Sequence, residues 1–280
     1  VVLANGAPVT MPWIDQVSAV IEGYLGGQAS GSGLADVLMG VQNPAGKLAE
    51  TFPLNLKDVP CTPFFPGERR QMQYREGVYV GYRYYDTARR DVLFPFGHGL
   101  SYTDFAYIEA NTSNASLSAD GSITLRVTIK NTGKRAGAEV IQVYRHSRGS
   151  ATHQPEQQLC GFAKVFLQPL EVATVTIELD AENFRTFDHG TNQWVLEAGA
   201  IQLRIGSSSR DIRLTQAINV VSTHTLSDVA KSTGAPEFLS PAHTQALDVP
   251  DALFRSMLNR PVPEGEDIRP FHRNSSLAEI

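Results

Sequence analysis

Cysteine is scarce in this sequence, with only Cys61 and Cys160 in 280 residues. Two widely separated cysteines cannot build a disulfide scaffold, and they are too few for a thiolate metal cluster. Apolar runs long enough to cross a bilayer are also absent, so we expect no membrane partner. The 24 basic residues are outnumbered by 29 acidic ones and form no basic stripe, which argues against nucleic acid as a partner.

The composition that is present is that of an ordinary globular protein, with 42% apolar and 19% charged residues over a length typical of two domains. The chain opens on Val1–Ala4 without an initiator methionine, a basic segment or a cleavage-site pattern, which indicates a buried strand rather than a signal peptide. We expect the natural N-terminus to lie upstream, and Phe271–Leu277 to begin a further element. Secreted, periplasmic and cytoplasmic locations all stay open.

Residues 1–53 alternate between strand and helix patterns. Apolar residues at helical spacing predict one helix over Pro12–Tyr24 and a second over about Gly33–Met39, while Val1–Ala4 and Lys47–Phe52 have the pattern of strands. This order is typical of the edge of a parallel α/β sheet. Fifty residues cannot bury both faces of such a sheet, so we predict that 1–53 is the C-terminal part of an α/β sandwich domain.

Three further regions follow. Residues 54–103 are rich in Pro, Gly, Tyr and Phe, which predicts an extended aromatic-rich linker. Residues 104–217 have the strand spacing of an all-β sandwich that resembles fibronectin type III. Residues 218–280 are proline-rich and predict a C-terminal extension with a short helix over Asp251–Leu258. The strands predicted in the sandwich are Ile123–Lys130, Val140–Tyr144, Leu159–Leu167, Ala173–Leu179, Trp194–Ala198 and Ala200–Ile205.

Motifs for nucleotide, serine-hydrolase and metal chemistry are missing. The glycine-rich stretch 26–33 precedes a predicted helix but lacks the Gly-Lys-Ser/Thr ending that binds phosphate and metal, so we favour a structural or sugar-facing loop. There is no Gly-x-Ser-x-Gly motif. The seven histidines include no pair four residues apart with a carboxylate between them. The sequence therefore predicts neither a metal site nor a cofactor.

Acidic residues are the remaining candidates for chemistry, because glycoside hydrolysis uses two carboxylates that flank the scissile bond. Asp15, Glu22 and Asp36 fit the solvated face of a predicted helix better than a site. Glu76 and Asp86 lie among tyrosines that suit stacking on sugar rings, although a tyrosine-rich extended segment is more often an anchor with buried rings. Sequence alone does not pair the eight candidates: Asp15, Glu22, Asp36, Glu50, Glu68, Glu76, Asp86 and Asp91.

Two long motifs in fixed order carry a specific resemblance. Tyr74–Asp86 reads YREGVYVGYRYYD, and Phe94–Phe105 reads FPFGHGLSYTDF. Together they closely resemble the signature that links the last two domains of glycoside hydrolase family 3, the β-glucosidase and β-xylosidase family. Upstream segments resemble the end of that family's α/β sandwich domain, and downstream segments resemble its fibronectin-III-like domain. These segments are Asn5–Val9, Gly26–Gln28, Ala35–Gly40, Asn43–Leu48, Thr51–Pro53, Val127–Gly133, Gly137–Val140 and Gln142–Tyr144.

The resemblance, which covers residues 1 to about 215, implies the C-terminal part of a retaining, exo-acting β-glycosidase, with a β-glucosidase favoured and a β-glucoside or oligosaccharide as substrate. It also implies an aspartate nucleophile on a (β/α)8 barrel and an acid/base glutamate in the α/β sandwich domain. Neither motif occurs here, so we assign no catalytic residue and expect both carboxylates upstream of residue 1. The segment alone should be inactive, with the upstream barrel and sandwich segments as its partners.

A second hypothesis belongs to another class of protein. A noncatalytic sugar-binding or adhesive β-sandwich module with an aromatic arm would have the same strand pattern and the same tyrosines. The substrate-binding residues, the sugar and its linkage, the role of 218–280 and the oligomeric state stay open at the level of sequence.

Overall fold

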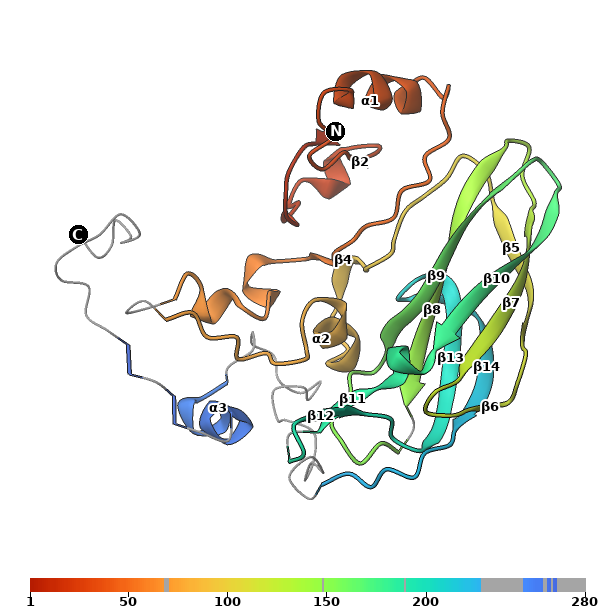
Figure 1. The fold of residues 1–280 in the computed structure, drawn as a ribbon. Coiled ribbons are helices and arrows are strands. Elements are labelled where there is room, and N and C mark those ends of the chain that lie inside the picture. The colour runs from red at the N-terminus through yellow and green to blue at the C-terminus, as the bar shows by residue number, and fades with distance from the viewer. Residues whose placement is uncertain are drawn as a thin grey trace.

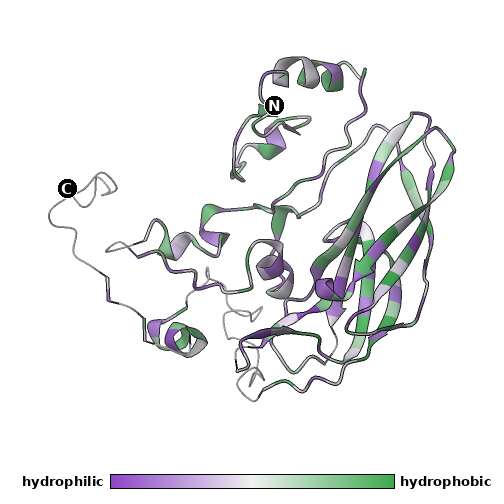
Figure 2. Ribbon diagram, in the orientation of Figure 1, coloured by the Kyte–Doolittle hydropathy of each residue, from purple (hydrophilic) through white to green (hydrophobic). Residues whose placement is uncertain are grey.

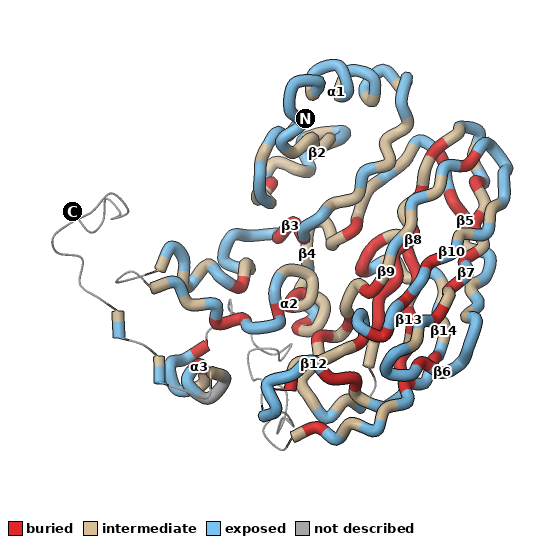
Figure 3. Tube along the Cα trace, viewed as in Figure 1, coloured by how far each residue is buried: buried red, intermediate tan, exposed pale blue. Residues whose placement is uncertain are grey.

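The computed structural model describes residues 1–67, 71–147, 149–188, 190–227, 249–258, 261–262 and 264–265. In Figure 1 the chain forms a large β-sandwich, a small N-terminal lobe that holds α1 and β2, and a connecting segment that holds β4 and α2. Buried residues concentrate in the sandwich and around α2, whereas the N-terminal lobe is mostly exposed or half-buried (Figure 3). A mixed α/β part followed by an all-β sandwich agrees with the predicted fold class.

The N-terminal lobe contains a two-stranded parallel sheet and one helix. Strand β1 (Val2–Leu3) pairs in parallel with β2 (Ile21–Glu22), and α1 spans Ser30–Leu38. The second predicted helix is thus confirmed, although it begins three residues earlier than predicted. The parallel pair confirms the predicted type of sheet, although β1 pairs with Ile21–Glu22 and not with the predicted strand Lys47–Phe52.

The predicted helix over Pro12–Tyr24 is wrong. Only a 3-10 turn, Ile14–Gln16, forms there, and the end of the segment becomes β2. The apolar spacing that suggested a helix comes largely from β-branched residues, which favour strands. The Ile21 N–H donates to the carbonyl oxygen of Val1 at 2.9 Å, so pairing with β1 replaces the helical hydrogen bonds.

The predicted strand Lys47–Phe52 is also largely wrong, because only its last residue belongs to a strand, β3 (Phe52–Pro53), which pairs with β4 (Val92–Phe94). Upstream of β3 the backbone pairs with a loop instead. The Leu48 N–H donates to the carbonyl oxygen of His98, and the Gly97 N–H donates to that of Leu48, each at 2.8 Å.

The linker 54–103 contains more regular structure than predicted. Two 3-10 turns, Leu56–Asp58 and Thr62–Phe64, precede α2 (Tyr82–Thr87) and β4. At six residues α2 is too short for a helical period to show in the sequence. Its Tyr84 and Tyr85 are buried, so the interpretation of the tyrosine-rich segment as an anchor is confirmed at these two positions.

The sandwich packs a three-stranded sheet on a five-stranded sheet, and each of the six predicted strands overlaps an observed one. The first sheet has the order β10 (Val172–Asp180), β7 (Ser122–Asn131), β5 (Phe105–Thr112). The second has the order β6 (Ser116–Leu117), β14 (Asp211–Val220), β13 (Gly199–Ser208), β8 (Gly137–Ser147), β9 (Gln158–Leu167).

Strict alternation along the strands builds the core between the two sheets. On β7, Ile123, Leu125, Val127 and Ile129 are all fully buried, and the residues between them are more exposed. Figure 2 shows the same alternation of hydrophobic and hydrophilic residues along several strands. The apolar pattern does not reveal β5, β6, β14 or β11 (Thr186–Asp188); in β14, for example, Gln216 interrupts the alternation.

Asp188 joins the hairpin of β11 and β12 (Gln193–Val195) to the segment that follows β14. Its Oδ1 accepts from the N–H of Gly190 at 2.8 Å and from the Ser227 hydroxyl, and its Oδ2 accepts from the Ser227 N–H at 2.9 Å. These hydrogen bonds, those from Ser227 foremost, hold the pKa of the fully buried Asp188 carboxyl well below its usual range.

The linker returns to the sandwich through a loop that lies on the outer face of the five-stranded sheet. The Ser209 N–H donates to the carbonyl oxygen of Phe96 at 2.9 Å, and the Gln142 side-chain amide donates to that of Gly97 at 3.1 Å. Gly97 has a φ of 80°, and a Cβ there would stand 2.0 Å from Gln142 Oε1. Both the backbone conformation and the contact therefore require glycine.

The C-terminal extension contributes one described helix, α3 (Asp251–Leu258), as predicted. Val249 and Phe254 join a second hydrophobic cluster with Tyr79, Tyr84 and Ala88. This cluster lies outside the sandwich core and is built from the linker and the extension together.

Tyr84→Ala should lower the free energy of unfolding by about 3–5 kcal/mol, because Tyr84 is among the largest fully buried side chains and its loss leaves a cavity. Tyr74→Ala is the matched control, since that ring is 69% exposed and its loss should change stability by no more than about 0.5 kcal/mol. Urea unfolding of both variants measures the difference. Equal effects at the two positions would contradict the burial of Tyr84.

Gly97→Ala should destabilise the chain by at least about 1 kcal/mol more than Gly149→Ala, because overpacking costs about 1–3 kcal/mol on top of the strain of a positive φ. Gly149 has a similar φ of 74°, but a Cβ there would meet no atom within 4 Å. The difference between the two variants therefore measures the clash with Gln142 apart from the strain of the positive φ. Urea unfolding at one pH and temperature tests this. Indistinguishable midpoints would show that the loop moves off the sheet without cost.

Asp188→Asn should reduce the loss of stability in acid. A carboxyl whose pKa is lower in the folded than in the unfolded chain stabilises the fold above the unfolded value of about 3.9, and that contribution fades as the pH falls. Urea unfolding at pH 6 and pH 3.5 should therefore show a smaller drop for the variant than for the parent chain. The same drop in both would exclude Asp188 as a source of acid sensitivity.

Candidate functional site

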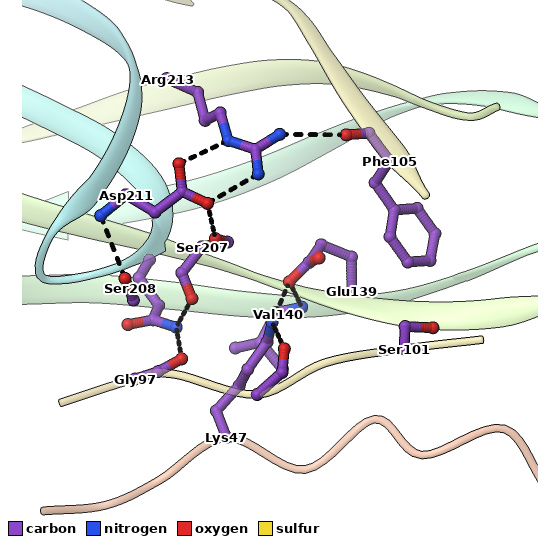
Figure 4. Close-up of polar contacts among 12 residues, drawn as sticks. Lys47, Gly97, Ser101, Phe105, Glu139, Val140, Ser207, Ser208, Asp211 and Arg213 are labelled. Carbon is purple, nitrogen blue, oxygen red and sulfur yellow. Dashed lines mark hydrogen bonds and ion pairs between the residues drawn. The ribbon is translucent and has the colours of Figure 1, made fainter. Parts of the chain in front are cut away.

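A polar network lies where the N-terminal lobe, the linker and the sandwich meet (Figure 4). Lys47 Nζ stands 3.0 Å from Glu139 Oε1, with the two side chains 13% and 8% exposed. Lys47 also donates to the carbonyl oxygen of Gly99 at 3.0 Å, and the Val140 N–H donates to Glu139 Oε1 at 2.8 Å. One lysine therefore ties the lobe to the linker and to β8.

Asn43 provides a second tie between the same three parts. Its side-chain amide donates to the carbonyl oxygen of Ala136, next to β8, at 3.0 Å. Its Oδ1 accepts from the Ser101 hydroxyl at 2.9 Å and from the Tyr102 N–H at 2.8 Å. The Arg135 guanidinium stands 5.7 Å from the centre of the Tyr102 ring, within the range of a cation–π contact.

Asp211 and Arg213 close the far side of this network, as Figure 4 shows. Arg213 donates twice to Asp211, at 2.7 and 2.6 Å, and once to the carbonyl oxygen of Phe105 at 3.3 Å. Asp211 also accepts from the Ser207 hydroxyl at 2.6 Å. The Arg213 hydrogen bonds hold the pKa of the Asp211 carboxyl below its ordinary value, so at neutral pH this acid is a charged structural partner.

Asp86, one of the two acids favoured by their aromatic surroundings, lies at the wall of a groove between α2 and the sandwich. The Arg210 side chain donates to its Oδ1 at 2.8 Å, and Gln157 donates to its Oδ2 at 3.2 Å. Burial raises the pKa of the Asp86 carboxyl, and the charge of Arg210 opposes that rise. The groove has a volume of about 490 Å³, and its walls carry the second ion pair Arg204–Glu156 at 2.9 Å.

Glu76, the other favoured acid, is 5% exposed in the linker. Within the described part of the chain, its Oε2 has no hydrogen-bond partner. Burial, with the nearby charge of Glu76, raises the pKa of the Cys61 thiol, so this cysteine is not an activated nucleophile. The hydrogen bonds of Asp86 reach Arg210 and Gln157, and none of them connects it with Glu76.

Of the remaining acidic candidates, those that the structure describes form no site either. Glu22 accepts from Asn5 at 3.1 Å and from the Tyr24 N–H at 2.7 Å, which caps the turn after β2. Glu68 lies outside the described residues. The other four are exposed: Asp15, Asp36, Glu50 and Asp91.

Metal and membrane features are not found in the described ranges. They hold no group of three His, Cys, Asp or Glu side chains placed to bind a metal ion. None of their helices has the length and apolar character needed to span a bilayer. The glycine-rich stretch 26–33 leads into α1, and most of its residues are exposed.

Sequence reasoning missed the residues of the network itself. No recognisable local pattern marks the polar residues Asn43, Lys47, Glu139 and Asp211. Their partners are distant in sequence: Gly99 lies 52 positions from Lys47, and Ala136 lies 93 positions from Asn43. For Asn43, Lys47 and Glu139 the available signal was their place in the segments Asn43–Leu48 and Gly137–Val140, which resemble family 3. Asp211 lies in none of the segments that carry the resemblance.

Two family models match the chain. The model described as the glycosyl hydrolase family 3 C-terminal domain matches residues 1–102, and the one described as a fibronectin type III-like domain matches residues 139–209. The first range includes the Tyr74–Asp86 motif, and the second includes most of β8 and all of β9 and β10.

Curated relatives and solved structures agree with these matches. Thermostable beta-glucosidase B from Acetivibrio thermocellus is 50% identical over 223 residues, which are 80% of this chain and 30% of the relative. The crystal structure of the beta-glucosidase from Kluyveromyces marxianus in complex with glucose has a TM-score of 0.74 at 39% identity, covering 79% of this chain and 26% of that one.

The GH3 beta-glucosidase from Bifidobacterium adolescentis has a TM-score of 0.75 at 38% identity, covering 82% of this chain and 35% of that one. The chain thus spans between a quarter and about a third of the length of these proteins. Residues 1–102 of this chain therefore belong to the C-terminal domain of glycosyl hydrolase family 3, and residues 139–209 form a fibronectin type III-like domain.

Proposed function

We propose that this chain is the C-terminal part of a retaining, exo-acting β-glucosidase that removes terminal β-linked glucosyl residues. The observation that carries the proposal is the 50% identity to a beta-glucosidase over 80% of this chain. The linker motifs Tyr74–Asp86 and Phe94–Phe105 support it, because they stand in the order in which family 3 enzymes have them. The substrate is then a β-glucoside or an oligosaccharide with such an end.

The proposal places both catalytic carboxylates outside this chain. A retaining glycosidase holds its nucleophile and its acid/base about 5–5.5 Å apart. Asp86 is occupied by Arg210 and Gln157, and neither Asp86 nor Glu76 matches a catalytic motif of the family. Their contacts suit structural acids, which is why we assign neither of them a catalytic role.

The role of the chain in such an enzyme is to hold its parts in position. The lobe, linker and sandwich are joined by the Lys47–Glu139 ion pair, by Asn43 and by the loop at Gly97. Catalytic groups have to be held to within about 0.5 Å, which demands such rigid supports. No specific observation favours the second hypothesis, a noncatalytic sugar-binding module. The groove beside Asp86 is lined by ion pairs, and none of its lining residues is an aromatic residue on which a sugar ring could stack.

The protein that contains this chain at full length should hydrolyse an aryl β-glucoside, and the 280-residue chain alone should not. The full-length protein, the chain alone, and the full-length variants Glu76→Gln and Asp86→Asn are assayed for release of the aryl group. We expect both variants to keep a turnover within about tenfold of the parent protein, because a structural acid affects catalysis only indirectly. Loss of a catalytic group would cost several orders of magnitude.

Aryl β-xyloside and aryl N-acetyl-β-glucosaminide serve as competing substrates in the same assay. Preference for either of them would keep the family and overturn the glucoside assignment. Turnover by the chain alone that is abolished by Glu76→Gln or Asp86→Asn would overturn the placement of the catalytic carboxylates.

A further inference from the structure

Arg75 joins the linker to the C-terminal extension. Its side chain lies between two aromatic rings, with the guanidinium carbon 4.5 Å from the centre of Phe64 and 4.9 Å from that of Phe254. Phe64 belongs to the linker and Phe254 to α3, so the two rings come from segments almost 200 residues apart. Arg75 itself is only 8% exposed. A planar guanidinium is well suited to stacking of this kind.

The hydrogen bonds of Arg75 strengthen the same junction. It donates to the carbonyl oxygen of Val249, to Asp251 Oδ1 and to Gln73 Oε1. The Asp251 side chain is 65% exposed, so that ion pair is screened by water and contributes little. Val249 is fully buried, and its carbonyl would lack this donor if Arg75 were removed. The contact to Val249 and the two rings therefore dominate.

The apolar side of the junction is a small hydrophobic core of its own. It consists of six buried residues, four from the linker and two from the extension: Tyr79, Tyr84, Tyr85, Ala88, Val249 and Phe254. Without the two residues of the extension, one side of this cluster would face water. Val249 and Phe254 also lie beyond residue 209, where the match to the fibronectin type III-like domain ends.

The chain that leads to the extension is fastened at a second point. After β14 it passes the β11–β12 hairpin, where Ser227 hydrogen-bonds to Asp188 and His224 Nε2 lies 3.5 Å from Asp188 Oδ2. The extension is therefore fixed to the β11–β12 hairpin at Ser227 and to the linker at Val249 and Phe254.

We propose that Val249–Leu258 is a strap that fastens the tyrosine-rich linker segment, so that the packing of Tyr79–Ala88 depends on the docked extension. The strap holds through Phe254 and Val249 on the apolar side and through Arg75 on the polar side. This role is separate from glycoside hydrolysis and does not rest on the proposed function.

Hydrogen–deuterium exchange of the 280-residue chain tests the strap. In Phe254→Ala we expect the amides of Ala88 and Arg90, which donate to the carbonyls of Tyr84 and Tyr85 at 2.8 Å, to exchange at least tenfold faster than in the parent chain. The amides of β7, in the centre of the sandwich, should keep their rates. Phe162→Ala is the matched control, because that ring is 66% exposed on β9.

Arg75→Ala and Arg75→Lys separate the polar from the apolar contribution. Arg75→Ala should also accelerate exchange at Ala88 and Arg90, and Arg75→Lys should recover only part of the protection, because an ammonium cannot stack and donate in the same geometry. Less than a threefold change at Ala88 and Arg90 in Phe254→Ala, with faster exchange confined to α3, would overturn the proposal. Equal acceleration in β7 would overturn it as well, because the linker would then have no separate dependence on the strap.

Discussion

The close approach of the loop Phe96–Gly99 to the sandwich determines where the preceding part of the chain lies. On one side, the loop backbone accepts hydrogen bonds from Gln142 of the five-stranded sheet and from Ser209, in the turn between β13 and β14. On the other side, its Gly97 and His98 pair with the backbone of Leu48. The loop is thus one layer between the sandwich and the lobe. A side chain at position 97 would occupy the space of Gln142, so the spacing of all three parts depends on a glycine there.

Aromatic and charged contacts around this loop have different physical roles. Phe96 stacks on Tyr82 with 4.6 Å between ring centres, and both rings approach Tyr144 of β8 edge-on. These contacts add stability through burial and ring geometry. The Lys47–Glu139 pair is almost fully desolvated, so its attraction is largely offset by the cost of removing both charges from water. We infer that this pair mainly fixes which surfaces meet, because a shift would leave a buried charge unpaired.

Sequence reasoning succeeded where one local pattern decides the structure. The alternation in β7 and β10 and the helical spacing of Asp251–Leu258 each show one face to be buried, and the structure has those elements. It failed where a distant partner overrides the pattern, as at Pro12–Tyr24, whose end pairs with β1, and at Lys47–Phe52, which pairs with the loop. Motif order identified the family, but no local pattern predicts that Asp86 binds Arg210, 124 positions away.

The distribution of buried residues explains why these long-range contacts matter. Among residues 1–50 only Met11 is buried, whereas the core of the sandwich takes apolar residues from both sheets. The sandwich can therefore be stable through its own core, whereas residues 1–50 depend on contacts outside themselves, since an interior of one residue does not offset the entropy of ordering fifty. The contacts of the lobe with β8 and the linker join residues about 50 to 90 positions apart, and such contacts cost more loop-closure entropy than local ones. Within this chain the lobe is held by its contacts with the linker and β8, so damage to the loop at Gly97 or to Glu139 should loosen the lobe while leaving the sandwich folded.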